Sequence, residues 1–246
     1  MQARPQFTTV AVYCASSNAV HPEYLACARD LGARIARSGR QLVYGGGRVG
    51  LMGETARACR EAGGRVIGVI TERLASLEQM DPDNHENVVV QTMRERKKLI
   101  EHRADAMIVL PGGLGTMEEF FEVLVGRLLG EHDKPIVILN SVDPNYAGSP
   151  SVMPIGPAGA GVEHDPHKTL SRASGERLHG RLNPGFYDPL LSMIEHMIES
   201  KFAKPGVRAL FEVCRTAGEA MSALERIERD GIAKMDKDLL TPSARE

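Results

Sequence analysis

The sequence predicts an α/β fold in a single domain, built on a doubly wound parallel sheet of about six or seven strands. Short apolar runs alternate with amphipathic segments of about 10 to 18 residues, which is the pattern of βαβ units. Runs such as Val66–Ile70 and Ala106–Leu110 are apolar throughout, as in strands that are buried on both faces. Glycine-rich turns follow two of the strands, Gln41–Tyr44 and Ala106–Leu110, and lead directly into helical patterns.

Each element follows from its own residue pattern. Strands rich in Val, Ile and Leu are predicted, in chain order, at 8–14, 41–44, 66–70, 88–90, 106–110 and 135–139, with a last strand or edge segment at 207–213. Helices are predicted at 21–38, at 51–62, from about 92, from 116, at 186–202 and at 216–229. The helix at 21–38 is typical, because Leu25, Ala28 and Leu31 fall on one face.

The composition argues against a nucleic-acid-binding or membrane-inserted protein. The 246 residues are 42% hydrophobic and 25% charged, with a formal net charge of −2, so we expect no electrostatic pull toward nucleic acid or membrane. Tryptophan is absent and aromatic residues make up 4%, which disfavours base stacking. No apolar run is long enough to cross a bilayer and the N-terminus lacks a signal-peptide core, so we expect a cytoplasmic location.

The cysteines predict neither a disulfide framework nor a metal site. Cys14, Cys27, Cys59 and Cys214 are scattered, without the spacing of metal ligands. We therefore expect buried free thiols and no bound metal.

Two segments depart from the regular alternation. Residues 141–184 contain many prolines and glycines, then a basic, histidine-containing stretch without clear periodicity. A loop of this length is usually either functional or disordered, so the pattern leaves open a loose flap or a lid that contacts the substrate. The polar tail from about residue 234 is expected to fray.

The segment Pro111–Glu119 carries the strongest functional signal. Its glycines lie between a predicted strand and a helix predicted to start at Thr116. They are Gly112, Gly113 and Gly115. A helix N-terminus offers unpaired N–H groups and the positive end of a dipole, which suits phosphate. Thr116 can cap the helix or reach a phosphate oxygen. Glu119 is either the partner of Thr116 in a capping box or a carboxylate with a chemical role.

A second glycine turn and a basic segment are predicted at the same edge of the sheet. Gly45–Gly50 follows the strand Gln41–Tyr44, and the basic run Arg94–Lys98 opens the helix after the strand at 88–90. The carboxyl ends of parallel strands meet at one edge, where open α/β sheets bind ligands. A charge run is usually a solvated helix face. Cations at a helix N-terminus oppose its dipole, however, so an anion would offset them, and Glu119 is a natural partner.

Taken in order, these motifs resemble the LOG (Lonely guy) family of cytokinin riboside 5′-monophosphate phosphoribohydrolases. The resemblance rests on Tyr44–Gly53, Met93–Lys97 and Pro111–Glu119. It covers roughly residues 8–140 and resumes at Gly185–Leu191. Many members carry an older label of lysine decarboxylase, but no residue pattern here supports a pyridoxal phosphate enzyme.

The resemblance implies a Rossmann-like fold, a homodimer or larger homo-oligomer, and no cofactor. The implied reaction is hydrolysis of the N-glycosidic bond of a nucleoside 5′-monophosphate, which releases a free base, such as adenine or an N6-modified adenine, and ribose 5-phosphate. The family's catalytic Arg and Glu correspond to Arg96 and Glu119. The residues implied to bind the substrate or its phosphate are Gly45, Gly46, Gly47, Glu78, Met93, Lys97, Gly112, Gly113, Gly115, Thr116 and Glu118.

Elementary chemistry agrees with these implied roles. Cleavage of an N-glycosidic bond passes through an oxocarbenium-like sugar. A carboxylate such as Glu119 stabilises that positive charge or activates the attacking water. We expect Arg96 to keep Glu119 ionised and oriented, because a nearby cation lowers the pKa of a carboxyl group. The 5′-phosphate would anchor the substrate on the glycine turn and so position the ribose.

Three other interpretations compete with this one. A non-catalytic nucleotide-binding or molybdenum-cofactor carrier protein has a similar glycine turn, but it does not need the pair Arg96 and Glu119. A broader nucleotide nucleosidase is poorly separated, because the base contacts are not readable. An NAD-dependent oxidoreductase is disfavoured, since Gly45–Gly50 follows the second predicted strand, whereas the dinucleotide-binding glycine turn follows the first. Departures from the family at Ala15, Arg94 and 125–130 bear on base specificity and subunit packing.

Overall fold

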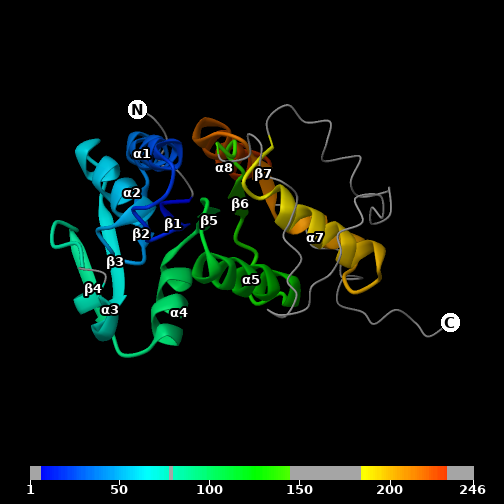
Figure 1. The fold of residues 1–246 in the computed structure, drawn as a ribbon, viewed down its shortest axis with the longest axis horizontal. Coiled ribbons are helices and arrows are strands. Elements are labelled where there is room, and N and C mark those ends of the chain that lie inside the picture. The colour runs from blue at the N-terminus through cyan, green and yellow to red at the C-terminus, as the bar shows by residue number, and fades with distance from the viewer. Residues whose placement is uncertain (1–6, 78–79, 145–183, 232–246) are drawn as a thin grey trace, which may run out of the picture.

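The computed structural model describes residues 7–77, 80–144 and 184–231, and their strands form one parallel sheet (Figure 1). The sheet has seven strands in the order β4-β3-β2-β1-β5-β6-β7. The strands are β1 Thr9–Tyr13, β2 Gln41–Tyr44, β3 Val66–Thr71, β4 Glu86–Val90, β5 Ala106–Val109, β6 Ile136–Leu139 and β7 Glu212–Cys214. The α/β fold class and the strand count of six or seven are thereby confirmed.

Helices cover both faces of the sheet, as expected for a doubly wound fold. One face is covered by α1 (Pro22–Arg37), α2 (Gly50–Glu61) and α8 (Ala217–Asp230). The other is covered by α4 (Met93–Arg103), α5 (Leu114–Leu129) and α7 (Asp188–Glu199). A short helix, α3 (Glu72–Leu77), and a 3₁₀ helix, η1 (Pro205–Leu210), complete the described elements.

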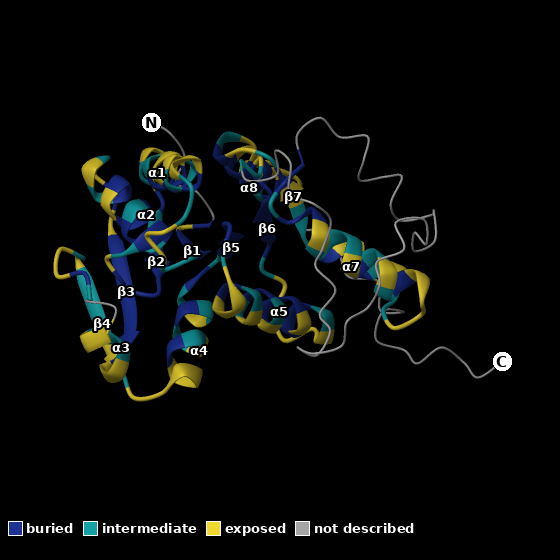
Figure 2. Cartoon of the chain, viewed as in Figure 1, coloured by how far each residue is buried: buried dark blue, intermediate teal, exposed yellow. Residues whose placement is uncertain are grey.

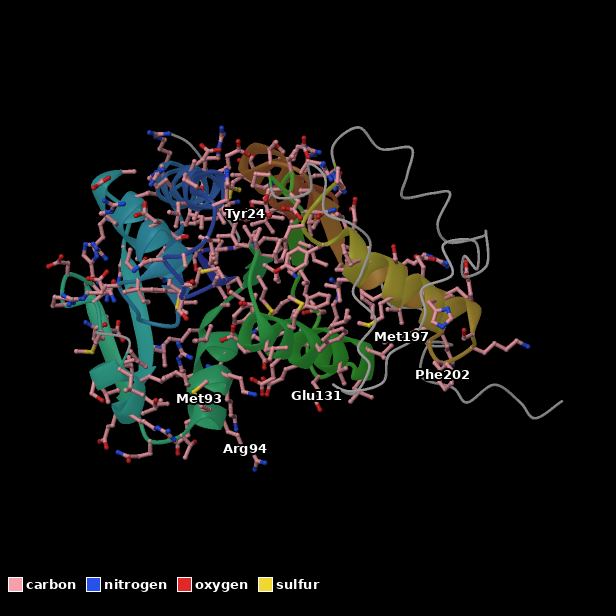
Figure 3. The ribbon with its side chains drawn as sticks, in the orientation of Figure 1. Tyr24, Met93, Arg94, Glu131, Met197 and Phe202 are labelled. Carbon is pink, nitrogen blue, oxygen red and sulfur yellow. The ribbon has the colours of Figure 1, made fainter. Side chains whose placement is uncertain are left out.

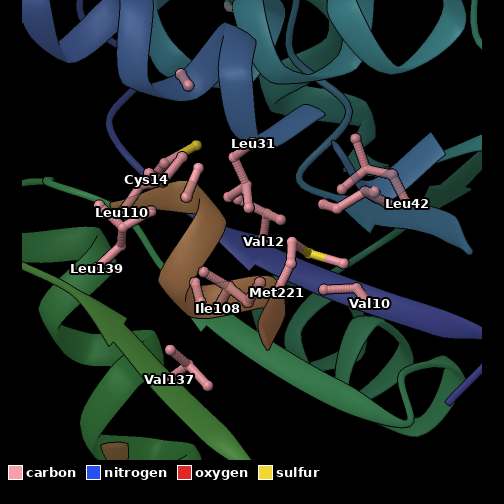
Figure 4. Packing of buried hydrophobic residues seen from close by; sticks show 14 of the residues in the cluster. Val10, Val12, Cys14, Leu31, Leu42, Ile108, Leu110, Val137, Leu139 and Met221 are labelled. Atoms are coloured by element: carbon pink, nitrogen blue, oxygen red, sulfur yellow. The ribbon is translucent and has the colours of Figure 1, made fainter. Parts of the chain in front are cut away.

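Side chains of the central strands alternate between two hydrophobic cores. Val10 and Val12 of β1 pack with α1, α2 and α8, where Figure 4 shows them near Leu31 and Met221. Residues between them, such as Ala11, pack on the opposite face with α4, α5 and α7. Every residue of β1, β3, β5 and β6 is buried, and Figure 2 shows β3 in dark blue along its length. This two-sided burial explains why these strands read as continuous apolar runs.

The strand order places a switch point between β1 and β5. The chain moves outward from β1 through β2, β3 and β4, then returns to the other side of β1 and continues through β5, β6 and β7. The loops after β1 and β5 therefore leave in opposite directions at the same carboxyl edge. Open α/β sheets bind their ligands at such a point.

Two predicted boundaries in the C-terminal third of the chain are wrong in detail. Residues 207–213 do not form one strand, because Pro205 opens the 3₁₀ helix η1 and only Glu212–Cys214 joins the sheet. The guanidinium of the buried Arg127 donates a 2.7 Å hydrogen bond to the Leu210 carbonyl and holds η1 against α5. Helix α7 begins at Asp188 rather than Phe186, since the two aromatic residues before it pack inside.

The ends of the predicted insertion are joined at a narrow neck. Val142 and Gly185 form an antiparallel bridge, and the Asp143 N–H donates to the Pro184 carbonyl at 2.9 Å. The two interpretations of the insertion, a loose flap or a lid, concern 145–183, which lie outside the described residues, as does the predicted frayed tail from 234. Within the described ranges, no helix is long and apolar enough to span a membrane.

Candidate active site

Helix α5 starts at the carboxyl edge of β5 with free backbone donors. Its N-cap is Gly113, and no side chain caps it. The N–H groups of Leu114, Gly115 and Thr116 have no acceptor in the part of the chain that the structure describes. The Leu114 side chain is 91% exposed, so this end of the helix opens to solvent. The geometry matches what an anion needs, because unpaired N–H groups and the helix dipole act at one point.

The predicted helix start at Thr116 is therefore wrong by two residues, and so is the capping role of Thr116. Because the helix begins at Leu114, Thr116 lies inside the first turn and forms no capping box with Glu119. Its side chain packs against Gly112, where an added Cβ would lie 2.1 Å from the Thr116 Oγ1. A capping box does form at the start of α4, between Thr92 and Glu95.

The three glycines of the Pro111–Thr116 segment are needed because they lack a side chain, and not because they adopt a backbone conformation that other residues avoid. None of them has a positive φ. Gly112 makes room for Thr116, whereas a Cβ at Gly113 or Gly115 would meet nothing within 4 Å. Gly113 and Gly115 thus leave open space directly beside the free N–H groups of α5.

Arg96 joins the residue after β2 to the backbone of β3. It is only 4% exposed, and its Nε donates to the Val69 carbonyl at 3.0 Å and its Nη2 to the Gly45 carbonyl at 2.7 Å. A Cβ at Gly45 would lie 2.1 Å from the Arg96 Nη2, so the glycine is needed for this side chain to fit. The remaining nitrogen, Nη1, contacts only the Met93 sulfur at 3.9 Å among the described residues.

The second glycine turn is held by backbone hydrogen bonds to the loop before β4. Gly46 has a φ of +77°, and its carbonyl accepts a hydrogen bond from the Asp81 N–H at 2.9 Å. Gly47 forms an isolated bridge with Met80. The buried Asp81 is paired with Arg60 at 2.9 Å. These contacts are not among the sequence predictions, although the turn at 81–84, which contains Pro82 and Asn84, is a signal for them. Glu78, predicted to contact the ligand, lies outside the described residues.

Glu119 is a partly buried carboxylate without a direct partner. It forms no hydrogen bond or ion pair with any described residue, and burial raises its pKa from 4.5 to about 7. The positive charge of Arg96 acts in the opposite direction but does not outweigh burial, and Glu118 adds to the rise. The expectation that Arg96 keeps the pKa of Glu119 low is thus not met.

Glu118 and Glu122, the two neighbouring acids on α5, form ion pairs, unlike Glu119. Lys97 of α4, whose side chain is 11% exposed, binds Glu118 at 2.5 Å and Glu122 at 2.9 Å. Burial alone would lower the pKa of Lys97, but hydrogen bonds to the two carboxylates more than offset it and the pKa is raised. Lys97 and Glu118 therefore pair with each other and join α4 to α5 beside Glu119.

The basic run Arg94–Lys98 is partly a solvated helix face and partly directed toward the site. Arg94 and Lys98 are exposed, and Figure 3 shows Arg94 pointing away from α4. Arg96 and Lys97 point inward. Met93, at the first position of α4, is 42% exposed beside Arg96. The structure thus brings most of the predicted site residues to one edge of the sheet.

Comparisons with known proteins give the family. A family model described as "Possible lysine decarboxylase" matches residues 52–147. The chain is 51% identical over 132 residues to the cytokinin riboside 5′-monophosphate phosphoribohydrolase of Mycobacterium tuberculosis, a match that covers 54% of this chain and 70% of that protein. It is 36% identical over 224 residues to the enzyme of the same name from Rhodococcoides fascians, which covers 91% of this chain and 92% of that protein.

A solved structure with the same fold is the molybdenum cofactor binding protein from Rippkaea orientalis. Its TM-score is 0.57 over 92% of this chain and 99% of that chain, but the identity is 18%. This likeness shows the fold alone. The relationship to the Rhodococcoides fascians enzyme spans nearly the whole of both chains, and this chain therefore belongs to the family of cytokinin riboside 5′-monophosphate phosphoribohydrolases.

Proposed function

We propose that this protein hydrolyses the N-glycosidic bond of adenosine 5′-monophosphates, including N6-modified ones, to free base and ribose 5-phosphate. The observation that carries the proposal is the unpaired carboxylate of Glu119, which lies one turn beyond the open N-terminus of α5. A site that only bound a phosphate would be weakened by a carboxylate in that position. The names of the relatives support the same reaction.

The N-terminus of α5 would hold the 5′-phosphate. The free N–H groups of Leu114, Gly115 and Thr116 supply donors, and the open space at Gly113 and Gly115 admits the phosphate oxygens. Binding energy from this remote group would fix the ribose near Glu119. No residue of this arrangement requires a cofactor.

Glu119 and Arg96 would act on the sugar. As the bond between C1′ and the base nitrogen breaks, positive charge develops on the ribose, and a carboxylate beside it lowers the energy of that state. Water then adds to C1′ and gives up a proton, while the departing base gains one. A pKa of about 7 lets Glu119 exist in both protonation states near neutrality. Among the described residues, the Arg96 Nη1 has no backbone acceptor, and this nitrogen would face the substrate.

The first prediction concerns turnover. Wild-type protein should release base from AMP and N6-isopentenyl-AMP, and Glu119→Gln should lower the rate by about 100-fold or more, because the charge on the carboxylate is lost. Chromatography of the products measures both. Glu131→Gln, on the exposed turn after α5, is the matched control and should keep the wild-type rate.

Three results would count against the proposal in different ways. Equal turnover of adenosine and AMP would mean that the 5′-phosphate does not anchor the substrate. An unchanged rate in Glu119→Gln would remove the catalytic role of Glu119. Binding of AMP with no base release from either nucleotide would favour a binding protein instead.

The second prediction separates a glycine that leaves room for the ligand, Gly115, from a glycine that is needed for packing inside the protein, Gly112. Gly115→Ala should fold as well as wild type, because its methyl group meets no protein atom within 4 Å, yet its affinity for AMP should fall about tenfold or more. Gly112→Ala should destabilise the protein by about 2 kcal/mol, because its Cβ would overlap Thr116. Thermal unfolding and titration calorimetry with AMP measure the two effects. Wild-type AMP affinity in Gly115→Ala would show that the phosphate binds elsewhere.

The third prediction concerns pH and stability. Because burial raises the pKa of Glu119 from 4.5 to about 7, the folded state binds this proton more tightly than the unfolded state. The free energy of unfolding contributed by Glu119 is therefore fully present below pH 4.5 and is lost as the pH rises through 7. Glu119→Gln cannot ionise, so its stability relative to wild type should grow with pH, by at most about 3 kcal/mol.

Urea unfolding at pH 5 and at pH 8 tests this difference. Glu131→Gln controls for the change of net charge. A stability difference between Glu119→Gln and wild type that is the same at both pH values would mean that the carboxyl group is not desolvated in the folded protein.

The fourth prediction concerns assembly. We propose a homo-oligomer in which the outer face of α5 is covered by a second copy. Val125 and Leu129 are 46% and 56% exposed and lie four residues apart on one helix face. Light scattering should give at least twice the chain mass of 26.8 kDa. The double variant Val125→Glu, Leu129→Glu should give one chain mass, and a monomeric wild type would contradict the proposal.

A further inference from the structure

Tyr187 reaches the phosphate loop, which is the segment 110–116 between β5 and the first turn of α5, from a distant part of the chain. Its side chain is 2% exposed, and its hydroxyl donates a 2.6 Å hydrogen bond to the carbonyl of Leu110, the residue before Pro111. Burial raises the pKa of this hydroxyl, and the backbone of Gly112 faces it and partly offsets that rise. One hydroxyl group thus contacts the chain on both sides of Pro111.

A closed polar network holds Tyr187 in this position. The Tyr187 N–H donates to Asn140 Oδ1 at 2.7 Å, and Asn140 Nδ2 donates to Asp188 Oδ1 at 2.8 Å. The other Asp188 oxygen accepts from the Gly185 N–H at 3.0 Å. A Cβ at Gly185 would lie 2.1 Å from Asn140 Oδ1, so the glycine is required for the network to close. Buried networks in which every group is paired fix a single geometry.

The phosphate loop has few other restraints. The Leu110 N–H donates to the Tyr13 carbonyl, and the Ala15 N–H donates to the Pro111 carbonyl at 3.2 Å; both contacts come from the β1 side. Gly113 and Gly115 have no side chains that could anchor the loop. Tyr187 supplies the restraint from the opposite side, where the chain turns from β5 into α5.

We propose that Tyr187 is a positioning residue for the reaction proposed above. Its hydroxyl sets where the free N–H groups at the start of α5 point, and thereby raises affinity for the 5′-phosphate without touching the substrate. Displacing such donors by a fraction of an ångström weakens every hydrogen bond to the anion together. The inference rests on the proposed function, and its test includes a binding measurement that needs no turnover.

Tyr187→Phe tests the proposal, with Tyr24→Phe as the matched control. The Tyr24 side chain is 4% exposed, and its hydroxyl donates to Asp143 Oδ1 at 2.7 Å. Both rings pack edge-on against Phe186, at centroid distances of 4.8 Å for Tyr187 and 5.6 Å for Tyr24. Each variant therefore loses one hydroxyl and a short hydrogen bond from the same aromatic cluster, but only one of them contacts the phosphate loop.

In Tyr187→Phe, the KM for AMP and the dissociation constant of ribose 5-phosphate, measured by calorimetry, should both rise about tenfold, while kcat changes less than about threefold. In Tyr24→Phe, both constants should stay within about twofold of wild type even if the melting temperature falls equally. Wild-type ribose 5-phosphate affinity in a folded Tyr187→Phe, or the same loss of affinity in both variants, would overturn the proposal.

Two additions keep the test readable. Asp188→Asn loosens the network but keeps the Tyr187 hydroxyl, and it should raise the same two constants in parallel by a smaller factor. If Tyr187→Phe fails to fold, unchanged constants in a folded Asp188→Asn would also overturn the proposal. A wild-type protein that binds ribose 5-phosphate but releases no base would refute the proposed function. The comparison of affinities between Tyr187→Phe and Tyr24→Phe would still decide the role of Tyr187.

Discussion

The Arg96 guanidinium is the contact on which the site depends. It extends from α4 and donates hydrogen bonds to the carbonyls of Gly45, just after β2, and of Val69, within β3. A buried cation is tolerated only when its donors are paired, and here two backbone carbonyls supply that pairing in place of a carboxylate. The charge is thus fixed in position without being neutralised. Loss of Arg96 would remove both the charge and the brace between two strands.

Helix periodicity then sorts the acids of α5 into two roles. Glu118 and Glu122 are four residues apart and share the face that meets Lys97. Glu119 is rotated by about 100° from Glu118 and turns toward the sheet edge. Because Lys97 already has two carboxylate partners, Glu119 keeps neither an ion pair nor a hydrogen bond among the described residues, and burial governs its pKa. Glu119 is thus the acid of these three whose carboxylate has no side-chain partner among the described residues.

Much of this arrangement could be predicted from the sequence, because it follows from local patterns. Apolar runs identified β1 to β6, and the two glycine turns marked the carboxyl edge. The sequence predicts the helix start two residues too late, because Thr116 and Glu119 have the spacing of a capping box, whereas the actual N-cap is Gly113, without any side-chain cap. Tyr187 could not be found this way, since it lies 77 residues from Leu110 and only the folded sheet brings them together.

The two halves of the sheet supply different parts of the site. The β2 and β3 side supplies Gly45 and the fixed charge of Arg96. The β5 and β6 side supplies the open end of α5 and the Leu110 carbonyl that the Tyr187 hydroxyl binds. They meet at the switch point beside β1, whose own backbone binds the phosphate loop. A ligand that bridges the two halves would engage phosphate donors on one side and the guanidinium on the other. In the proposed function, the pairing of β1 with β2 and β5 would therefore set the distance between the N–H groups that hold the phosphate and the Arg96 guanidinium that faces the sugar.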